Sequence, residues 1–168
     1  MHELSNMPET TPRSELIVAS IEHVRELMTW FSDEPAVRVW GGPAFHYPFT
    51  EASFLDGLRW GQMPTYALME NKVILTGFGQ LYFKAGRAHL ARIAVAPSRR
   101  GRGHGHVLVE RLIEKGQELF QCKEQSLYVM RANDRALRCY LKAGFVQAPV
   151  PPGEREYADR IFMVRKVG

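Results

Sequence analysis

Apolar residues in the first third of the chain recur mostly at the three- and four-residue spacing of amphipathic helices. A short apolar run at Leu16–Ala19 predicts a first strand, and the spacing after it predicts helices over Ser20–Phe31 and Thr50–Leu58. Each helix begins at a residue whose hydroxyl group suits the N-cap position. The stretch between them, Val37–Pro48, is rich in Trp, Gly and Pro, and we expect it to form an ordered loop.

The middle of the chain changes to a strand pattern. Thr65–Met69 and Val73–Phe83 are rich in apolar and aromatic residues, and Asn71–Lys72 between them suits a two-residue hairpin turn. A second turn, at Lys84–Arg87, leads to an apolar strand at Ala88–Ala96. These three strands predict an antiparallel meander.

The last third of the chain alternates between helix and strand signals. The expected elements are a helix over Gly103–Phe120, a strand over Ser126–Met130, a short helix capped by Asn133 that ends near Ala143, a strand over Phe145–Gln147, a Pro-rich loop over Ala148–Glu156 and a final strand over Tyr157–Val167. Together with the preceding elements, this order predicts a mixed α/β domain.

Length, composition and charge limit the class of protein. A chain of 168 residues with 45% apolar residues predicts a single globular domain over residues 15–168, preceded by a flexible polar arm over residues 1–14. No run of about 18 apolar residues occurs, so we expect no membrane partner. The only cysteines, Cys122 and Cys139, have no disulfide or metal spacing, which predicts a reducing, cytoplasmic location. The net charge of +4 indicates an anionic partner.

The most informative segment lies where the strand at Ala88–Ala96 ends. After Pro97, the segment Arg99–Gly105 contains three arginines and three alternating glycines and leads directly into the predicted helix. Glycines allow backbone N–H groups to approach a phosphate, and the N-terminus of the helix adds free N–H donors and the positive end of its dipole. This segment therefore predicts a diphosphate-binding turn. Its glycine spacing is neither the dinucleotide fingerprint nor the nucleotide-binding loop.

Two motifs resemble those of the GCN5-related N-acetyltransferases. Arg100, Gly103 and Gly105 fill the Arg/Gln-x-x-Gly-x-Gly/Ala motif of this family, and Asn133–Phe145 resembles its Asn-x-x-Ala-x-x-x-Tyr-x-x-x-Gly-Phe segment. The resemblance covers Thr65 to Val164 and fades through the first 60 residues. It implies a mostly antiparallel sheet of six to seven strands flanked by about four helices, with a splay after the central strand.

The resemblance also implies a cosubstrate and a set of site residues. The cosubstrate would be acetyl-coenzyme A, without a metal, and the acceptor would be an amine. The implied cofactor-binding residues are Ile93, Ala94, Val95, Arg100, Gly101, Arg102, Gly103, His104, Gly105, Asn133 and Tyr140. Of these, Tyr140 matches the tyrosine that donates a proton to the departing thiolate, and its alternative role is to pack the short helix against the sheet.

The general base is the least defined part of the site. Many relatives carry a glutamate at or near the position of His89, and a neutral imidazole there would accept the amine proton near physiological pH. The alternative is a structural strand histidine with a local partner, the amine proton then passing to ordered water. His104 and His106 diverge on a helix and have no third ligand, so we expect no metal site.

Two other functions compete with acetyl transfer. One is a non-catalytic module of the same fold that binds coenzyme A or acyl-coenzyme A. The other is a nucleic-acid-binding domain, which we do not expect because the arginines concentrate in the glycine turn. The sequence leaves the acceptor open between a small-molecule amine and a protein amino group. It also leaves the oligomeric state open, with a homodimer as one option.

Overall fold

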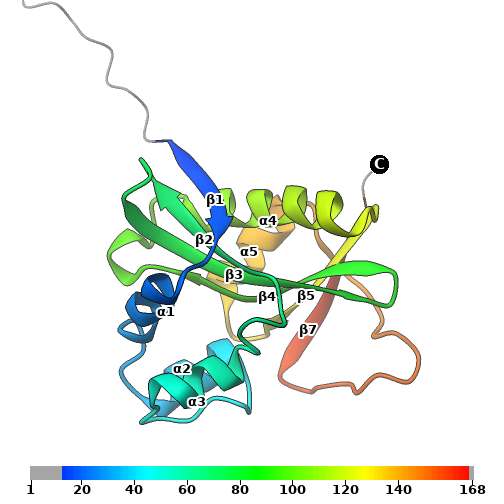
Figure 1. Cartoon of the computed structure of the whole chain (residues 1–168). Helices are drawn as coiled ribbons and strands as arrows, with labels where there is room; N and C mark the ends of the chain where they lie inside the picture. Colours follow the sequence, from blue (N-terminus) through cyan, green and yellow to red (C-terminus); the bar gives the residue numbers. More distant parts are fainter. Residues whose placement is uncertain (1–12, 167–168) are drawn as a thin grey trace, which may run out of the picture.

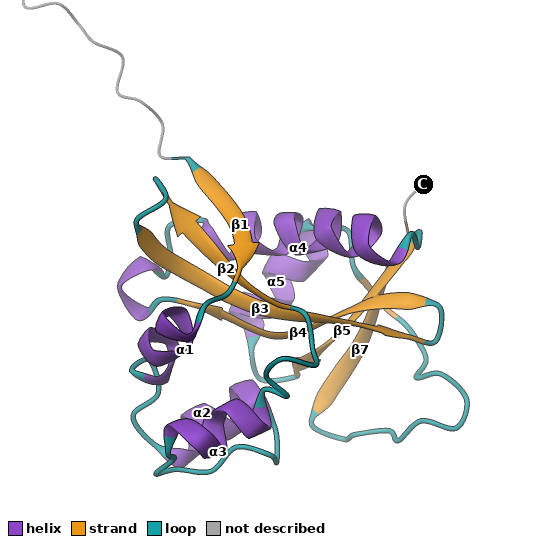
Figure 2. Ribbon diagram, in the orientation of Figure 1, coloured by secondary structure: helices purple, strands orange, loops and turns teal. Residues whose placement is uncertain are grey.

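A seven-stranded sheet forms the centre of the molecule in the computed structural model, which describes residues 13–166 (Figures 1 and 2). The strands are β1 (Ser14–Val18), β2 (Thr65–Glu70), β3 (Ile74–Lys84), β4 (Arg87–Val95), β5 (Glu124–Met130), β6 (Val146–Gln147) and β7 (Arg160–Lys166). The helices are α1 (Ile21–Met28), α2 (Glu34–Gly41), α3 (Glu51–Gly57), α4 (His104–Phe120) and α5 (Asp134–Lys142), with a 3-10 turn η1 at Pro97–Arg99. The order in the sheet is β1-β2-β3-β4-β5-β7-β6. This arrangement confirms the mixed α/β fold.

The two faces of the sheet carry separate cores. On one face, α4 packs against β3 and β4 through buried residues such as Leu108 and Leu112, and this core continues to Tyr140 on α5. On the other face, α1, α2 and α3 bury a second cluster that includes Phe54 and Phe78. Figure 1 shows α4 and α5 on one side of the sheet and α1, α2 and α3 on the other. The sheet therefore separates two apolar cores.

The meander of β2, β3 and β4 matches the sequence prediction. Asn71 and Lys72 both adopt positive φ, 51° and 62°, which is the backbone conformation of a type I′ hairpin turn. β2 and β3 pair antiparallel, as do β3 and β4. The pairing of β3 with β4 shifts register between Phe78 and Gln80, so β4 carries a bulge near Arg92, whose φ is 49°.

The central feature of the sheet is the parallel pair β4 and β5. The two strands are in register only at Ala88 with Gln125 and at His89 with Ser126. Along its other edge, β4 stays paired with β3 as far as Val95. β4 and β5 therefore diverge after His89, as the sequence resemblance implies, and one edge of β4 faces the gap (Figure 2).

Three sequence predictions need correction. The stretch Val37–Pro48 is not all loop, because α2 covers its first five residues. The side chain of Asp33 accepts a hydrogen bond from the backbone N–H of Ala36 at 2.8 Å, and Pro35 occupies the first turn, so both ordinary helix-start signals are present. β7 begins at Arg160, later than predicted. Ser14 belongs to β1, and residues 1–12 of the predicted arm lie outside the described residues.

Two compositional predictions can be compared with the described residues. None of the helices within residues 13–166 is long and apolar enough to cross a membrane. Cys122 and Cys139 are both free thiols.

Close packing of α4 on β4 gives a test of this arrangement. A Cβ atom at Gly116 would lie 2.8 Å from the Cβ atom of Ala88, closer than real contacts allow. We expect Gly116→Val to lower the free energy of unfolding by about 2 kcal/mol or more, because the helix must move away from the sheet. Urea unfolding measures this change. Glu114→Val, at an exposed position of the same helix, is the control and should change stability by less than about 1 kcal/mol. Equal effects of the two variants would contradict this packing.

Candidate active site

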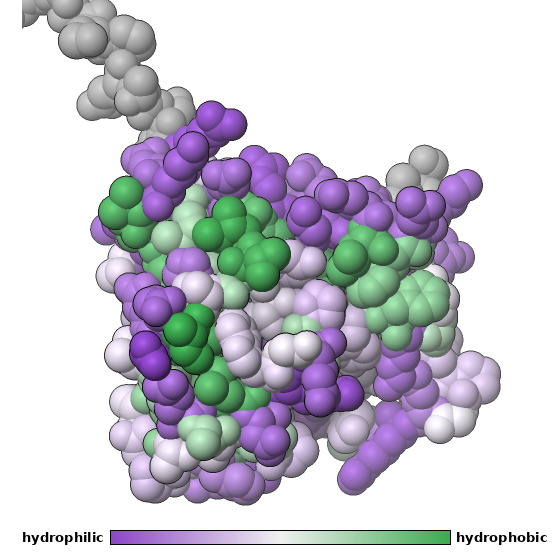
Figure 3. All heavy atoms as spheres, in the orientation of Figure 1, coloured by the Kyte–Doolittle hydropathy of each residue, from purple (hydrophilic) through white to green (hydrophobic). Residues whose placement is uncertain are grey.

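A cleft of about 1630 Å³ opens where β4 and β5 diverge. Its lining comes from both sides of the sheet: α2 and the chain around Arg59 on one side, and η1, α4 and α5 on the other. Figure 3 shows the surface hollowed on the side of α2 and α3, with strongly hydrophilic atoms at its border. A smaller hollow of about 670 Å³ lies between β1 and α4 and shares none of these residues.

The free edge of β4 forms one wall of the cleft. Ile93, Ala94 and Val95 all line it, as the sequence resemblance implies. Because the pairing of β4 with β5 ends at His89, the backbone groups on this edge beyond His89 are not used by a strand of the sheet. An unpaired strand edge offers a row of N–H and C=O groups to an extended, amide-containing ligand.

The glycine turn lies at the end of this wall. Gly101 and Gly103 have φ of 76° and 84°, and a Cβ atom at either would meet nothing within 4 Å. Gly103 is the N-cap of α4 and supplies no side-chain acceptor for the first N–H groups of the helix. Those N–H groups therefore retain their capacity to bind an anion. The geometry fits a diphosphate, which needs open space and several donors.

The predicted residues of the turn are only partly brought together. Arg100, Gly101, Gly103 and Gly105 line the cleft, whereas Arg102 and His104 do not. The guanidinium of Arg99 lines the cleft but is held by the buried carboxylate of Glu70, at 2.8 Å between Nη1 and Oε2. Its charge is largely used to fix the turn to the end of β2.

The short helix α5 supplies the predicted asparagine and tyrosine. Asn133 caps it, its Oδ1 accepting a hydrogen bond from the backbone N–H of Ala136 at 3.2 Å, and Asn133 also lines the cleft. Tyr140 is 8% exposed and lies on the same cleft wall. Burial raises the pKa of the Tyr140 phenol, and the neighbouring Cys139 raises it further. The phenol therefore keeps its proton at physiological pH.

His89 sits at the apex of the splay. Its side chain is 5% exposed, and its Nδ1 lies 2.9 Å from Oγ of Ser126, its partner across the strand pair. Burial lowers the pKa of His89 to about 3, and the charge of Lys84 adds to the shift. The imidazole is thus neutral and weakly basic, and its hydrogen bond joins β4 and β5 at their last point of contact.

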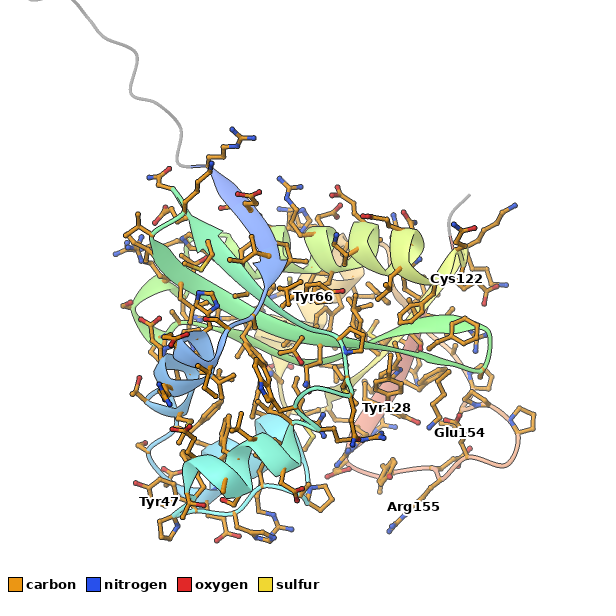
Figure 4. All side chains as sticks on the ribbon, in the orientation of Figure 1. Tyr47, Tyr66, Cys122, Tyr128, Glu154 and Arg155 are labelled. Carbon is orange, nitrogen blue, oxygen red and sulfur yellow. The ribbon has the colours of Figure 1, made fainter. Side chains whose placement is uncertain are left out.

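Several cleft residues were missed by the sequence analysis. Tyr82 and Tyr128 flank His89, with ring centroids 4.7 Å and 5.7 Å from the imidazole. Figure 4 shows Tyr128 on the side of the sheet that carries α2 and α3. Strand alternation gives a signal here, because Tyr82 lies two residues from Gln80, whose side chain reaches α3. Arg59 and Arg92 were also missed, and nothing in the sequence marks the bulge that carries Arg92.

Metal ligands are not clustered in this site. Within the part of the chain that the structure describes, there is no group of three or more His, Cys, Asp or Glu side chains placed to hold a metal ion.

A comparison with known families identifies one match. The model of the acetyltransferase (GNAT) family matches residues 24–145, which include β4, the glycine turn, α4 and all of α5.

Similar solved structures share the whole arrangement of elements. An aminoglycoside acetyltransferase in complex with coenzyme A has a TM-score of 0.70 at 22% identity, over 92% of this chain and 95% of that one. The ribosomal-protein-S18-alanine N-acetyltransferase from Escherichia coli has a TM-score of 0.63 at 19% identity, over 92% of this chain and 94% of that one. A dodecameric spermidine N-acetyltransferase from Vibrio cholerae has a TM-score of 0.65 at 16% identity, over 91% of this chain and 93% of that one. At these identities the likeness shows the fold, and the acceptors of the three proteins differ.

The buried imidazole gives a pH-dependent test of the site. Folding lowers the pKa of His89 from 6.5 to about 3, so below pH 6.5 the unfolded chain gains a proton that the folded chain does not. This stabilising contribution is complete above pH 6.5 and is lost as the pH falls toward 3. Between pH 6.5 and 5, wild type should lose about 2 kcal/mol more stability than His89→Asn, whose amide can keep the hydrogen bond to Ser126.

Urea unfolding at a series of pH values measures this difference in slope. His46→Gln, which removes an exposed histidine, is the control and should follow wild type. Identical slopes for wild type and His89→Asn would show that the imidazole takes up a proton as readily in the folded state as in the unfolded state.

Proposed function

The chain belongs to the acetyltransferase (GNAT) family, and we propose that it transfers the acetyl group of acetyl-coenzyme A to a primary amine by direct attack in a ternary complex. As a member of this family, it uses acetyl-coenzyme A as its cosubstrate. The amine belongs to a small molecule or to a protein. Solved relatives of the same fold act on aminoglycosides, spermidine and a ribosomal protein, which supports an amine acceptor without selecting one.

One observation carries this proposal: the free edge of β4, the open N-terminus of α4 and the buried Tyr140 all line a single cleft. The first suits an extended pantetheine arm, the second a diphosphate and the third a departing thiolate. We assign the backbone groups of Ile93–Val95 to the arm and the thioester carbonyl. We assign Arg100 and Gly101–Gly105 to the diphosphate.

Tyr140 donates a hydrogen bond to the departing sulfur in this proposal. The amine nitrogen bonds to the carbonyl carbon, the carbon–sulfur bond breaks, and the thiolate must be stabilised as it forms. The raised pKa of Tyr140 keeps its proton available but makes complete transfer to a thiolate unfavourable. The phenol therefore acts as a hydrogen-bond donor whose effect grows with the charge on sulfur.

The amine proton needs a different acceptor. His89 lines the cleft, yet its pKa of about 3 makes it a weak base. We propose that ordered water takes the proton and that the neutral imidazole accepts or donates a hydrogen bond in positioning it. This role agrees with the structural alternative for His89 that the sequence analysis left open.

Replacement of Tyr140 by Phe tests this mechanism. The ring and its packing stay, but the phenolic proton that we assign to the sulfur is removed. We expect turnover to fall by roughly ten- to a thousandfold while the affinity for acetyl-coenzyme A persists, because the lost hydrogen bond matters mainly in the transition state. Thiol release with a panel of amines measures turnover, and calorimetry measures affinity. An acyl donor with a more acidic thiol should reduce the difference.

Tyr66→Phe is the matched control for this experiment. Tyr66 is also a buried tyrosine, but it lies in the core under α4 and does not line the cleft (Figure 4). Wild-type turnover in Tyr140→Phe would remove Tyr140 from the mechanism. Tight binding of acetyl-coenzyme A without thiol release from any amine would instead favour a non-catalytic binding module.

Two further properties stay predictions. The free thiols of Cys122 and Cys139 are in keeping with a cytoplasmic protein. The homodimer is the other, and one solved relative of the same fold is dodecameric.

A further inference from the structure

The charges that line the cleft have one sign. Seven arginines belong to its lining, and no aspartate or glutamate does among the residues that the structure describes. Three of the seven, Arg99, Arg100 and Arg135, lie on η1, next to the glycine turn, and on α5, where a diphosphate accounts for positive charge. The others lie elsewhere in the cleft and need a separate explanation.

Arg59 and Arg92 lie on the side of the sheet that carries α2 and α3. The guanidinium of Arg92 donates to the Oε1 atom of Gln80 at 2.8 Å and to the backbone carbonyl of Gly41, at the end of α2, at 3.3 Å. Three residues of β4, about 10 Å of strand, separate Arg92 from the end of the strand at Val95, and the glycine turn lies beyond that end. Arg92 therefore lies away from the turn to which the diphosphate is assigned.

Neither arginine has a carboxylate partner within the described residues. Arg92 is half-buried, and its Nη2 atom forms no hydrogen bond with any of them. Burial lowers the pKa of Arg92, and the nearby charge of Arg59 lowers it further. Two neighbouring cations, one of them partly desolvated, repel each other, and a bound anion would relieve that repulsion.

Three carboxylates on segments that border the cleft are already paired. Glu154, on the loop before β7, lies 3.4 Å from Nζ of Lys84 (Figure 4). Asp159 pairs with Arg160 at 3.3 Å, and Glu34 pairs with Arg38 at 3.5 Å. A polycation such as a polyamine would thus meet repulsion from the arginines of the lining, which contains no aspartate or glutamate among the described residues.

We propose that the acceptor is an amine that also carries an anionic group, a carboxylate or a phosphate, and that Arg59 and Arg92 bind this group in the cleft. The inference rests on the proposed acetyl transfer and adds the class of acceptor. The planar guanidinium groups form charge-assisted hydrogen bonds to either anion. Tyr82 and Tyr128 provide aromatic surface for the rest of the molecule.

Matched amines test this inference. Phenylalanine, phenylalaninamide and phenethylamine share one side chain and differ in charge beside the amine, and phosphoethanolamine and ethanolamine form the corresponding phosphate pair. Spermidine represents the polycations. We expect kcat/KM for the anionic member of at least one set to exceed that of its neutral analogues by about tenfold or more. The amide controls for amine basicity, because its amine is no more basic than that of the amino acid. The two sets separate carboxylate from phosphate.

Arg59→Gln then tests the assigned residue. Arg59 is exposed, so its loss leaves the core intact, and it should lower kcat/KM for the preferred anionic amine by about tenfold while changing that of the neutral analogue little. Arg25→Gln is the control, since Arg25 is an exposed arginine on α1 that pairs with Glu51 and does not line the cleft. It should behave as wild type.

The outcomes separate this inference from the proposed function. Thiol release that favours spermidine or the neutral amines would overturn the inference and leave acetyl transfer standing. No thiol release from any amine would overturn both. A preference for anionic amines that Arg59→Gln leaves unchanged would overturn the role of Arg59.

Discussion

The divergence of β4 and β5 beyond His89 is the constraint on which the rest of the site depends. Two parallel strands that separate after two paired residues leave one edge of β4 without a strand partner, in the middle of the sheet and not at its margin. The bond between His89 and Ser126 fixes the apex of this opening. A buried imidazole with a lowered pKa holds that bond in its neutral form across the physiological range.

Because the opening passes through the sheet, it joins two sides that differ in chemistry. The glycine turn, α4 and α5 surround one mouth and offer N–H donors and a protonated phenol. α2, Arg59 and Arg92 surround the other and offer guanidinium groups and aromatic rings. At the bulge in β4, Arg92 points toward α2, whereas Ile93 and Val95 pack on the core under α4. Neighbouring residues of β4 therefore reach both sides of the opening. A ternary complex needs this kind of two-sided access.

Local signals in the sequence predict much of this architecture. The hairpin at Asn71–Lys72, the caps at Ser20, Thr50 and Asn133, and the glycine turn all depend on residues close together in the chain, so they can be read directly. The helix α2 was missed although Asp33 and Pro35 mark its start, because its Trp and Gly residues suggested a loop.

Features that depend on distant residues could not be predicted from the sequence. The burial of His89 and its bond to Ser126 join positions 37 residues apart, so neither its neutral state nor its low pKa follows from the strand pattern. The position of Arg92 depends on the bulge in β4, and that of Arg59 on the chain after α3. The charge of Arg99 is paired with Glu70, which lies far from it in the sequence at the end of β2. Tertiary contacts decide which charges are free.

Hydrogen exchange of the backbone amides, with and without acetyl-coenzyme A, tests most directly whether the cosubstrate binds in the opening between β4 and β5. The account predicts slower exchange at residues 93–95 and 101–105, because the free edge of β4 and the N-terminus of α4 would donate to the ligand. Exchange in β1, which is remote from the cleft, should not change. Unchanged exchange in both segments under saturating ligand, with protection elsewhere in the chain, would contradict the account.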